Sequence, residues 1–110
     1  MSSRSATAYP EVEDDTSDQL QPLYHVILLN DDDHTYEYVI QMLQKLFGYP
    51  PEKGFLMAKE VDTTGRVIVA TTTMEHAELK RDQIHAFGAD PHIPRCKGSM
   101  SAVIEPATDE

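Results

Sequence analysis

The residues with the greatest capacity for chemistry lie together in "NDDDH", which runs from Asn30 to His34. An amide, three carboxylates and an imidazole come directly after the apolar stretch "YHVILL" and directly before a helical pattern. A helix N-terminus favours nearby acids and one capping side chain, and Asp33 or His34 stands where that N-cap belongs. One cap needs one acid, so the remaining oxygens predict a second role. Asn30 and Asp31 could present oxygens to a ligand ammonium group through strong, charge-assisted hydrogen bonds.

A metal ion is the first alternative for this oxygen-rich segment. The segment lacks the alternating D-x-D-x-D-G pattern and the distant glutamate with which proteins wrap calcium. The histidines show no paired ligand spacing, and they are His25, His34, His76, His85 and His92. The sequence therefore predicts no metal site and no cofactor.

An enzyme is the second alternative. No glycine-rich phosphate loop, G-x-S-x-G motif or H-E-x-x-H motif occurs in the sequence. Cys96 could pair with one of the histidines, but one cysteine and scattered histidines do not make a catalytic signature. We therefore expect no catalytic residues and a protein that acts by binding.

The composition narrows the classes of partner. The formal net charge is −10 over 110 residues, and no basic stripe interrupts it, which disfavours nucleic acid and favours cationic partners. No apolar run is long enough for a membrane span, and the first residues lack the apolar core of a secretory signal. The single cysteine allows no internal disulfide and is typical of a reducing cytoplasm. A cytoplasmic monomer is the expectation.

The elements that must position the acidic segment follow from the apolar periodicity. A continuous apolar run predicts a strand buried on both faces over 24–29. An apolar stripe at helical spacing then predicts a helix ended by Gly48, and its members are Tyr36, Val39, Ile40, Leu43, Leu46 and Phe47. The later expected elements are a helix over 50–61, a turn over 62–65, a strand over 66–72, a helix over 74–87, a loop over 89–98 and a strand over 99–105. Thr72 and Glu75 have the spacing of a capping box for the third helix.

This order of elements, β-α-α-β-α-β, predicts an α+β fold in which a small three-stranded antiparallel sheet packs against three helices. Residues 1–22 hold five acids against one base and few apolar side chains, so we expect a disordered acidic N-terminal extension. Residues 23–106 form the expected core domain, and 107–110 form a short C-terminal tail.

Two motifs resemble a known family. "YHVILLNDDDHTYEYVIQMLQKLF" resembles the opening of ClpS, the adaptor of the ClpAP-type ATP-dependent protease, whose hallmark is "NDD" between its first strand and a helix like "EFVIDVLQKFF". "TTTMEHAELK", from Thr71 to Lys80, resembles the "AETK" helix segment of that family. The two motifs stand in the family's order. The resemblance covers roughly Tyr24 to Gly88.

The resemblance implies an adaptor and not an enzyme. ClpS-like proteins bind the bulky apolar first residue of a substrate, called an N-degron, and deliver the substrate to a Clp AAA+ unfoldase. By this likeness, the substrate α-ammonium would be held by Asn30 and Asp31. The positions that match the family's side-chain pocket are His34, Tyr36, Val39, Ala58 and Val61. Those that match its docking residues for the unfoldase N-terminal domain are Glu75 and Lys80. Residues 1–22 match the extension that engages the ATPase ring.

This chain also departs from the family pattern. The family usually has a histidine that reaches the α-amino group, and Asp62 stands at that position, where a carboxylate can also accept from an ammonium. Tyr36 stands where a methionine is usual and could narrow the pocket, whereas Ala58 replaces another methionine and could widen it. The segment "ADPHIPRCKGSM" is longer than usual, and Ile93 is our only suggestion for its pocket residue. A second hypothesis is therefore a docking regulator of the unfoldase that does not read N-termini.

Overall fold

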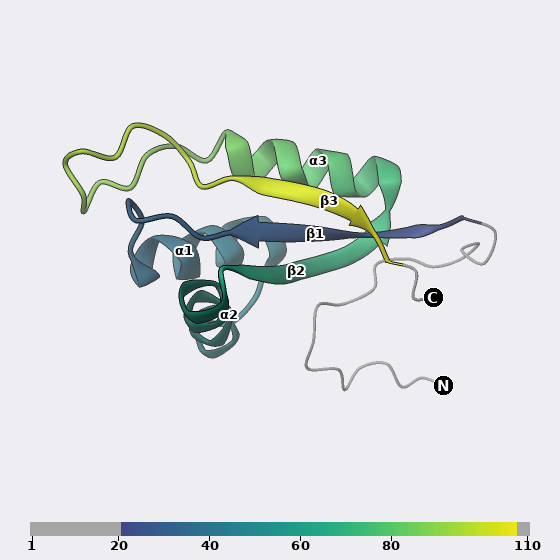
Figure 1. The fold of residues 1–110 in the computed structure, drawn as a ribbon, viewed down its shortest axis with the longest axis horizontal. Coiled ribbons are helices and arrows are strands. Elements are labelled where there is room, and N and C mark those ends of the chain that lie inside the picture. The colour runs from purple at the N-terminus through teal and green to yellow at the C-terminus, as the bar shows by residue number, and fades with distance from the viewer. Residues whose placement is uncertain (1–20, 108–110) are drawn as a thin grey trace.

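The computed structural model describes residues 21–107 and has the predicted α+β architecture. Its elements are, in chain order, β1 (Leu23–Leu29), α1 (Tyr36–Phe47), α2 (Pro51–Thr64), β2 (Arg66–Thr73), α3 (Met74–His85) and β3 (Ala102–Pro106). Figure 1 shows the three strands side by side with the helices beside them. The expected acidic extension lies almost wholly outside the described residues, as does most of the expected tail.

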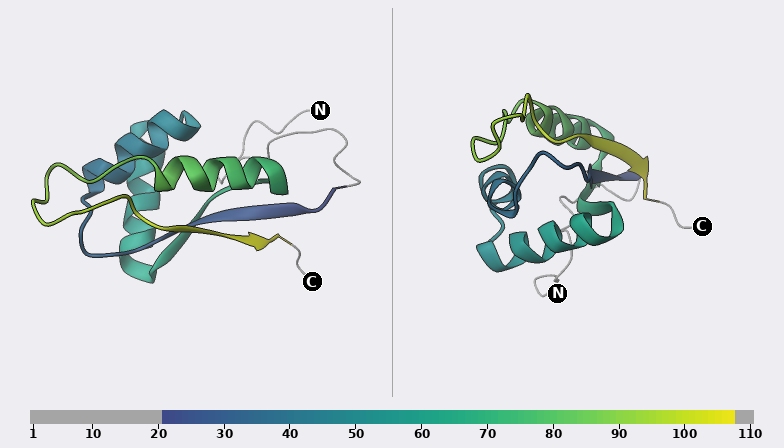
Figure 2. Two further views of the ribbon diagram at one scale, coloured as in Figure 1. Left: turned by 90° about the horizontal axis from the view of Figure 1, so that it is seen from above. Right: turned by 60° about the vertical axis from the view of Figure 1, so that its left-hand side comes forward.

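The sheet is antiparallel with strand order β2-β1-β3, so β1 is its central strand. This position explains the continuous apolar run in β1, because Val26, Ile27 and Leu28 are all fully buried. The helices lie on one side of the sheet, as the two views in Figure 2 show. The β1–β2 register shifts after Val26, where β2 carries one extra residue, Val69. The Tyr49 hydroxyl donates to the Val69 carbonyl oxygen at 2.6 Å and so supports this bulge.

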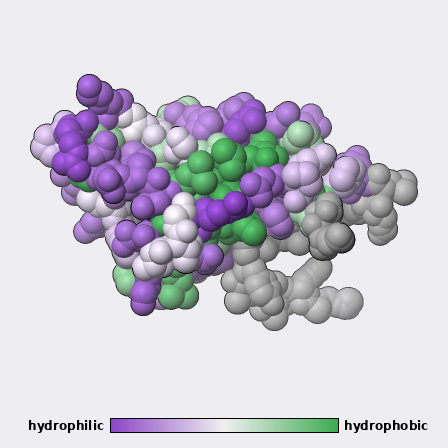
Figure 3. All heavy atoms as spheres, viewed as in Figure 1, coloured by the Kyte–Doolittle hydropathy of each residue, from purple (hydrophilic) through white to green (hydrophobic). Residues whose placement is uncertain are grey.

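No helix of residues 21–107 covers the outer face of the sheet, yet Ile27 on this face has no exposed surface. Its cross-strand partners, Ile68 and Val103, flank it on both sides. Arg66 and Glu105 come from the two outer strands and form an ion pair of 2.9 Å. Their register positions lie on opposite sides of Ile27, so the pair passes across this face. Figure 3 shows hydrophobic residues, in green, near the middle of this face, with hydrophilic residues, in purple, around them.

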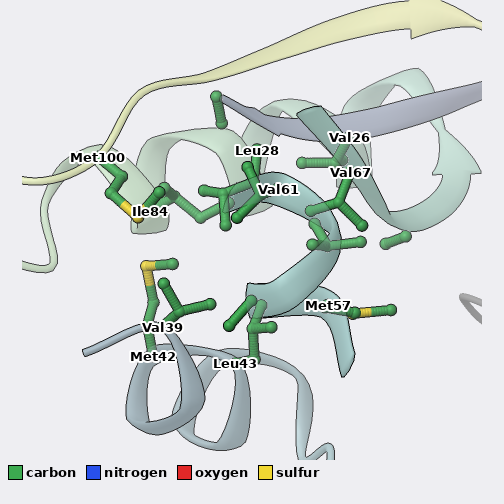
Figure 4. Close-up of a cluster of buried hydrophobic side chains, with 14 of the residues drawn as sticks. Val26, Leu28, Val39, Met42, Leu43, Met57, Val61, Val67, Ile84 and Met100 are labelled. Atoms are coloured by element: carbon green, nitrogen blue, oxygen red, sulfur yellow. The ribbon is translucent and has the colours of Figure 1, made fainter. Parts of the chain in front are cut away.

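The core lies between the other face of the sheet and the helices. Val26 and Leu28 point from β1 into this space (Figure 4). Each helix contributes buried apolar side chains, among which are Val39, Met42, Leu43, Met57, Val61 and Ile84. Gly54 in α2 allows the close approach of the first two helices, because a Cβ there would lie 3.3 Å from the Cα of Ile40. This contact gives a reason for a glycine that otherwise weakens a helix.

The N-cap of α1 differs from the prediction. Thr35 is the N-cap, with extended backbone (φ −89°, ψ 167°), and its side chain accepts from the Tyr38 amide. Neither Asp33 nor His34 has this role. The acids of "NDDD" are therefore not needed as helix caps, and oxygens of Asp31 and Asp33 accept hydrogen bonds from other groups.

The predicted turn over 62–65 is also wrong, because α2 continues through Thr64 and ends at Gly65. Gly65 has φ 95° in the left-handed region, where a glycine is favoured. The Thr64 hydroxyl donates to the Glu60 carbonyl oxygen at 2.9 Å and supports the last turn. Asp62 therefore lies on a helix rather than in a loop.

Smaller corrections concern α3 and β3. Thr73 is the N-cap of α3, whereas Thr72 is buried and pairs with Tyr24 in the sheet, so the predicted capping box is wrong. The helix ends at His85 rather than next to Gly88. The last strand begins at Ala102, three residues later than predicted, and includes Pro106. The segment between α3 and β3, residues 86–101, is hereafter the long loop.

Candidate functional site

The segment Asn30–Asp33, hereafter the acidic turn, joins the end of β1 to the approach of α1. The backbone amide of Asn30 donates to the carbonyl oxygen of Gly65 at 3.0 Å. This bond fixes the acidic turn beside the C-terminal end of α2, where Asp62 lies one turn before Gly65. Asn30, Asp31 and Asp62 are all exposed. The fold therefore places near one another, at one end of the sheet, the three residues that the sequence and the family resemblance together suggest for an ammonium group.

The Asp31 carboxylate has a fixed orientation. Its Oδ1 accepts from the Asp33 amide at 2.8 Å and from Nδ1 of His34 at 2.7 Å. The His34 side chain is only 4% exposed, and its Nε2 lies 2.8 Å from the carbonyl oxygen of Gly98. The imidazole thus stands between the carboxylate and the long loop. These contacts orient the Asp31 carboxylate. The pocket-lining role that the resemblance implies for His34 stays a prediction.

Asp62 has a partner on α1. The Tyr36 hydroxyl donates to Asp62 Oδ2 at 2.8 Å. This hydrogen bond raises the pKa of Tyr36 above its ordinary value, with smaller contributions from burial and from the charge of Asp62. The Tyr36 ring also contacts the Phe55 ring, with 5.6 Å between centroids. Tyr36 therefore joins the start of α1 to the outer face of α2.

The remaining residues expected in a side-chain pocket come from the facing sides of the first two helices. Val39 in α1 is 3% exposed, and Ala58 and Val61 in α2 are 1% and 2% exposed. All three belong to the buried apolar cluster of the domain. An apolar region thus lies between α1 and α2. Tyr36 of α1 and Asp62 of α2 lie at the edge of this region.

The long loop carries contacts that the sequence did not predict. Nε of Arg95 donates to Asp33 Oδ1 at 2.6 Å, and another guanidinium nitrogen donates to the Asp32 carbonyl oxygen at 3.0 Å. These contacts hold the long loop against the acidic turn. Ile93, suggested as a pocket residue, donates its amide to the Asp90 carbonyl oxygen within the loop. A periodic pattern could not have revealed this docking, because the partners are 62 and 63 residues apart.

Asp90 is the buried anchor of the long loop. Its side chain has no exposed surface, and its Oδ2 accepts from the amide and hydroxyl of Thr35 at 2.6 and 2.9 Å. Its Oδ1 accepts from the amide and Nδ1 of His92. Burial alone would raise the pKa of Asp90, but these hydrogen bonds outweigh burial and lower the pKa to about 2 from 3.8. The carboxylate caps α1 jointly with Thr35.

Cys96 lies beside a histidine, which is the pairing that a cysteine nucleophile would need. Its Sγ is 3.3 Å from Nε2 of His34, whose other nitrogen faces Asp31. The carbonyl oxygen of Gly98, however, is 2.8 Å from Nε2 and 3.2 Å from Sγ. This acceptor competes for the proton that must pass from thiol to imidazole in nucleophile activation. Asp31, His34 and Cys96 therefore lack the free thiol–imidazole contact of a nucleophilic site.

Comparison with known proteins identifies the family. A model described as the ATP-dependent Clp protease adaptor protein ClpS matches residues 19–94 of the chain. The chain belongs to the ClpS family. The ATP-dependent Clp protease adapter protein ClpS of Salmonella arizonae is 38% identical over 85 residues, which cover 76% of this chain and 80% of the relative. Its counterpart in Salmonella paratyphi B is 36% identical with the same coverage.

A solved ClpS structure has the same fold. The structure of Agrobacterium tumefaciens ClpS2 bound to L-phenylalaninamide is 26% identical to this chain, with a TM-score of 0.66. The match covers 77% of this chain and 96% of that chain. The family likeness and the α+β fold predicted from the sequence are thus confirmed.

The residues expected to dock a ClpS protein on its unfoldase lie on α3. Glu75 is exposed in the first turn of this helix. Lys80 makes intramolecular contacts, because its Nζ donates to the carbonyl oxygen of Leu46 at 2.5 Å and lies 5.1 Å from the centre of the Phe47 ring. Lys80 therefore holds α3 to the C-terminal end of α1. Any contact with a partner must share its ammonium group with this structural role.

Two classes of feature have no counterpart in residues 21–107. No group of three or more histidine, cysteine, aspartate or glutamate side chains there could hold a metal ion. No helix in the same range is long and apolar enough to cross a membrane.

Proposed function

We propose that this ClpS protein binds substrates by a bulky apolar N-terminal residue and delivers them to a Clp AAA+ unfoldase, acting by binding alone. The observation that carries the proposal is the orientation of Asp31, whose Oδ1 is occupied by intramolecular donors. A carboxylate held in this way has its second oxygen available for a ligand. Asp62 lies beside the acidic turn, and buried apolar side chains of α1 and α2 lie next to both. The ClpS2 neighbour bound to L-phenylalaninamide, a free amine with an aromatic side chain, supports the same ligand class.

The expected affinity suits an adaptor that must release its cargo. Burying a leucine or phenylalanine side chain contributes about 1.5–3 kcal/mol. Each hydrogen bond between the ammonium and a charged oxygen contributes roughly 1.5–3 kcal/mol. After the cost of association, a few such contributions give dissociation constants on the order of micromolar.

The first test removes the carboxylate that the structure orients. Asp31→Ala should weaken binding of a Leu- or Phe-initiated peptide by at least about tenfold, the effect of one lost charged hydrogen bond. Fluorescence anisotropy measures the binding, and N-acetylation of the same peptides should abolish it in the unaltered protein. Asp32→Ala is the matched control, because it removes the same charge from the neighbouring position.

Equal peptide affinity in the Asp31→Ala protein and the unaltered protein would contradict the proposal, provided that circular dichroism shows the fold intact. An equal loss in Asp31→Ala and Asp32→Ala would attribute the effect to net charge rather than to an oriented oxygen. A loss confined to Asp31→Ala supports a defined ammonium site.

A second candidate is a docking regulator that binds the unfoldase without reading N-termini. The observation that favours it is the Tyr36–Asp62 hydrogen bond, which occupies one oxygen of the carboxylate at the position where the family usually has its histidine. This candidate predicts capture of a Clp unfoldase but no binding of any free-amine peptide. Peptide binding that is lost on N-acetylation excludes it.

A further inference from the structure

Two departures of this chain from the family pattern contact each other. Tyr36 stands where the family usually has a methionine, and Asp62 stands where it usually has a histidine. The structure joins them by the 2.8 Å hydrogen bond from the Tyr36 hydroxyl to Asp62 Oδ2. The phenol and the carboxylate therefore have to be interpreted as one unit.

Ala58 belongs to the same unit. Phe55, Ala58 and Asp62 stand at positions i, i+3 and i+7 of α2, so they share one helix face. Tyr36 contacts the first of them through its ring and the last through its hydroxyl. The residue between them is an alanine, whose single methyl group leaves room for a ring above it. A long side chain at position 58 would compete with the Tyr36 ring for this space.

Tyr36 therefore has two contacts that hold its ring across this face of α2. Rotation of the ring away from α2 breaks both the hydrogen bond to Asp62 and the ring contact with Phe55. Because Tyr36 begins α1, its backbone is fixed by the helix, and only the side chain can move. The ring thus has one well-supported position at the edge of the apolar region between the two helices.

We infer that Tyr36, held by Asp62, is the specificity-determining residue of the N-terminal site and favours an aliphatic first residue over an aromatic one. This inference rests on the proposed function. A leucine side chain is shorter than that of phenylalanine or tryptophan, so it enters beside the ring. A longer aromatic side chain requires the ring to move and therefore loses the contacts that hold it.

The inference assigns Asp62 two separable properties. As an acceptor, it holds the Tyr36 hydroxyl, and this property sets selectivity. As an anion, it attracts the ligand ammonium, and this property affects every free-amine peptide alike. Asp62→Asn keeps an acceptor oxygen and removes the charge, whereas Asp62→Ala removes both.

The experiment measures the affinities of Leu-, Phe- and Trp-initiated peptides by fluorescence anisotropy, each with its N-acetylated control. Tyr36→Phe should improve the affinity for Phe- and Trp-initiated peptides relative to the Leu-initiated peptide by about tenfold, the effect of one hydrogen bond to a charged group. Tyr36→Ala should raise the ratio of aromatic to leucine affinity further, and Asp62→Ala should also raise this ratio. Asp62→Asn should preserve the ratio while weakening all three peptides. Tyr24→Phe is the control, because it removes a tyrosine hydroxyl at the opposite end of β1.

The outcomes separate this inference from the proposed function. If the unaltered protein binds but neither Tyr36 variant changes the ratio by twofold, the inference is overturned and the proposed function stands. A ratio changed by Tyr36→Phe but not by Asp62→Ala also overturns it. If only Tyr36→Ala binds free-amine peptides, the ring closes the site of the unaltered protein to every first residue, which overturns both the inference and the proposed function. If no variant binds, both are overturned.

Discussion

At the scale of single residues, the side chains of the acidic turn have different roles, although three of them are aspartates. Asp31 is oriented by Asp33 and His34, and Asp33 is in turn held by Arg95. An exposed carboxylate without such contacts rotates freely, and a ligand must then immobilise it at a cost in entropy. The intramolecular donors reduce this cost. His34 is therefore as important to the candidate site as a residue that touches the ligand.

His34→Ala should weaken binding of free-amine peptides by roughly tenfold, because Asp31 loses a charge-assisted hydrogen bond that orients it. His34→Asn should recover part of the loss, since its amide nitrogen can donate from near the position of Nδ1. His34→Gln places its amide farther out and should recover less. Calorimetric titration with a Leu-initiated peptide measures all three variants. Equal losses in the three would show that His34 only supports the fold.

At the scale of elements, the long loop is attached to the start of α1 by a buried carboxylate. Asp90 satisfies the Thr35 amide, one of the donors that a helix N-terminus leaves without intrahelical partners. Arg95 attaches the same loop to the acidic turn. The long loop is therefore held in place beside the start of α1 and the acidic turn, even though it contains no regular secondary structure.

The lowered pKa of Asp90 predicts that the stability of the fold depends on pH. The pKa of Asp90 in the folded protein is about 2, below its ordinary value of 3.8. The ionised carboxylate therefore stabilises the folded state when the pH is above 3.8. That contribution is lost as the pH falls through 3.8 toward about 2. Asp90→Asn should reduce the free energy of unfolding by about 2–3 kcal/mol at neutral pH, the effect of weakened hydrogen bonds to a charged group.

Urea denaturation of both proteins across this pH range tests the sign. The difference between the unaltered protein and Asp90→Asn should be largest at neutral pH and should shrink in acid. A difference that stays constant down to the lowest pH would show that the charge of Asp90 contributes nothing to folding.

At the scale of the whole molecule, the two expected binding regions lie at opposite ends of β1. The acidic turn follows Leu29, whereas α3 begins after Thr73, the partner of Leu23 at the other end of the strand. Seven residues of β-strand separate them, a distance of roughly 20 Å. Sites this far apart are expected to act independently. An adaptor with this layout can hold cargo and its unfoldase at the same time.

Glu75→Ala should weaken capture of a Clp unfoldase by about fivefold, the effect of one lost hydrogen bond, while peptide affinity stays unchanged. Pull-down with the purified unfoldase and peptide anisotropy on the same protein measure the two effects. Glu78→Ala, one turn further along α3, is the matched control. Lys80→Ala is a poorer test, since Lys80 also holds α3 to Leu46. Unchanged capture by Glu75→Ala would remove this residue from the proposed docking surface.

The sequence by itself determined the family, the order of elements and the place of the acidic turn. These follow from local information: an unbroken apolar run for a central strand, an apolar stripe for α1, and motifs of contiguous residues. The element boundaries were less well predicted, because the extension of α2 to Thr64 depends on Gly65 and on hydroxyl contacts with the preceding turn. The glycine was visible in the sequence, but its role as a helix C-cap was not assigned.

Only the tertiary structure decided how the site is built. The contact of Asp90 with Thr35 joins residues 55 positions apart, and that of Tyr36 with Asp62 joins residues 26 apart. Periodicity describes which face of an element is buried, but it does not specify which polar side chains meet across elements. Those partners depend on the packing of α1 against α2 and of the long loop against the acidic turn. The sequence therefore located the acidic turn, and the fold determined which contacts orient its side chains.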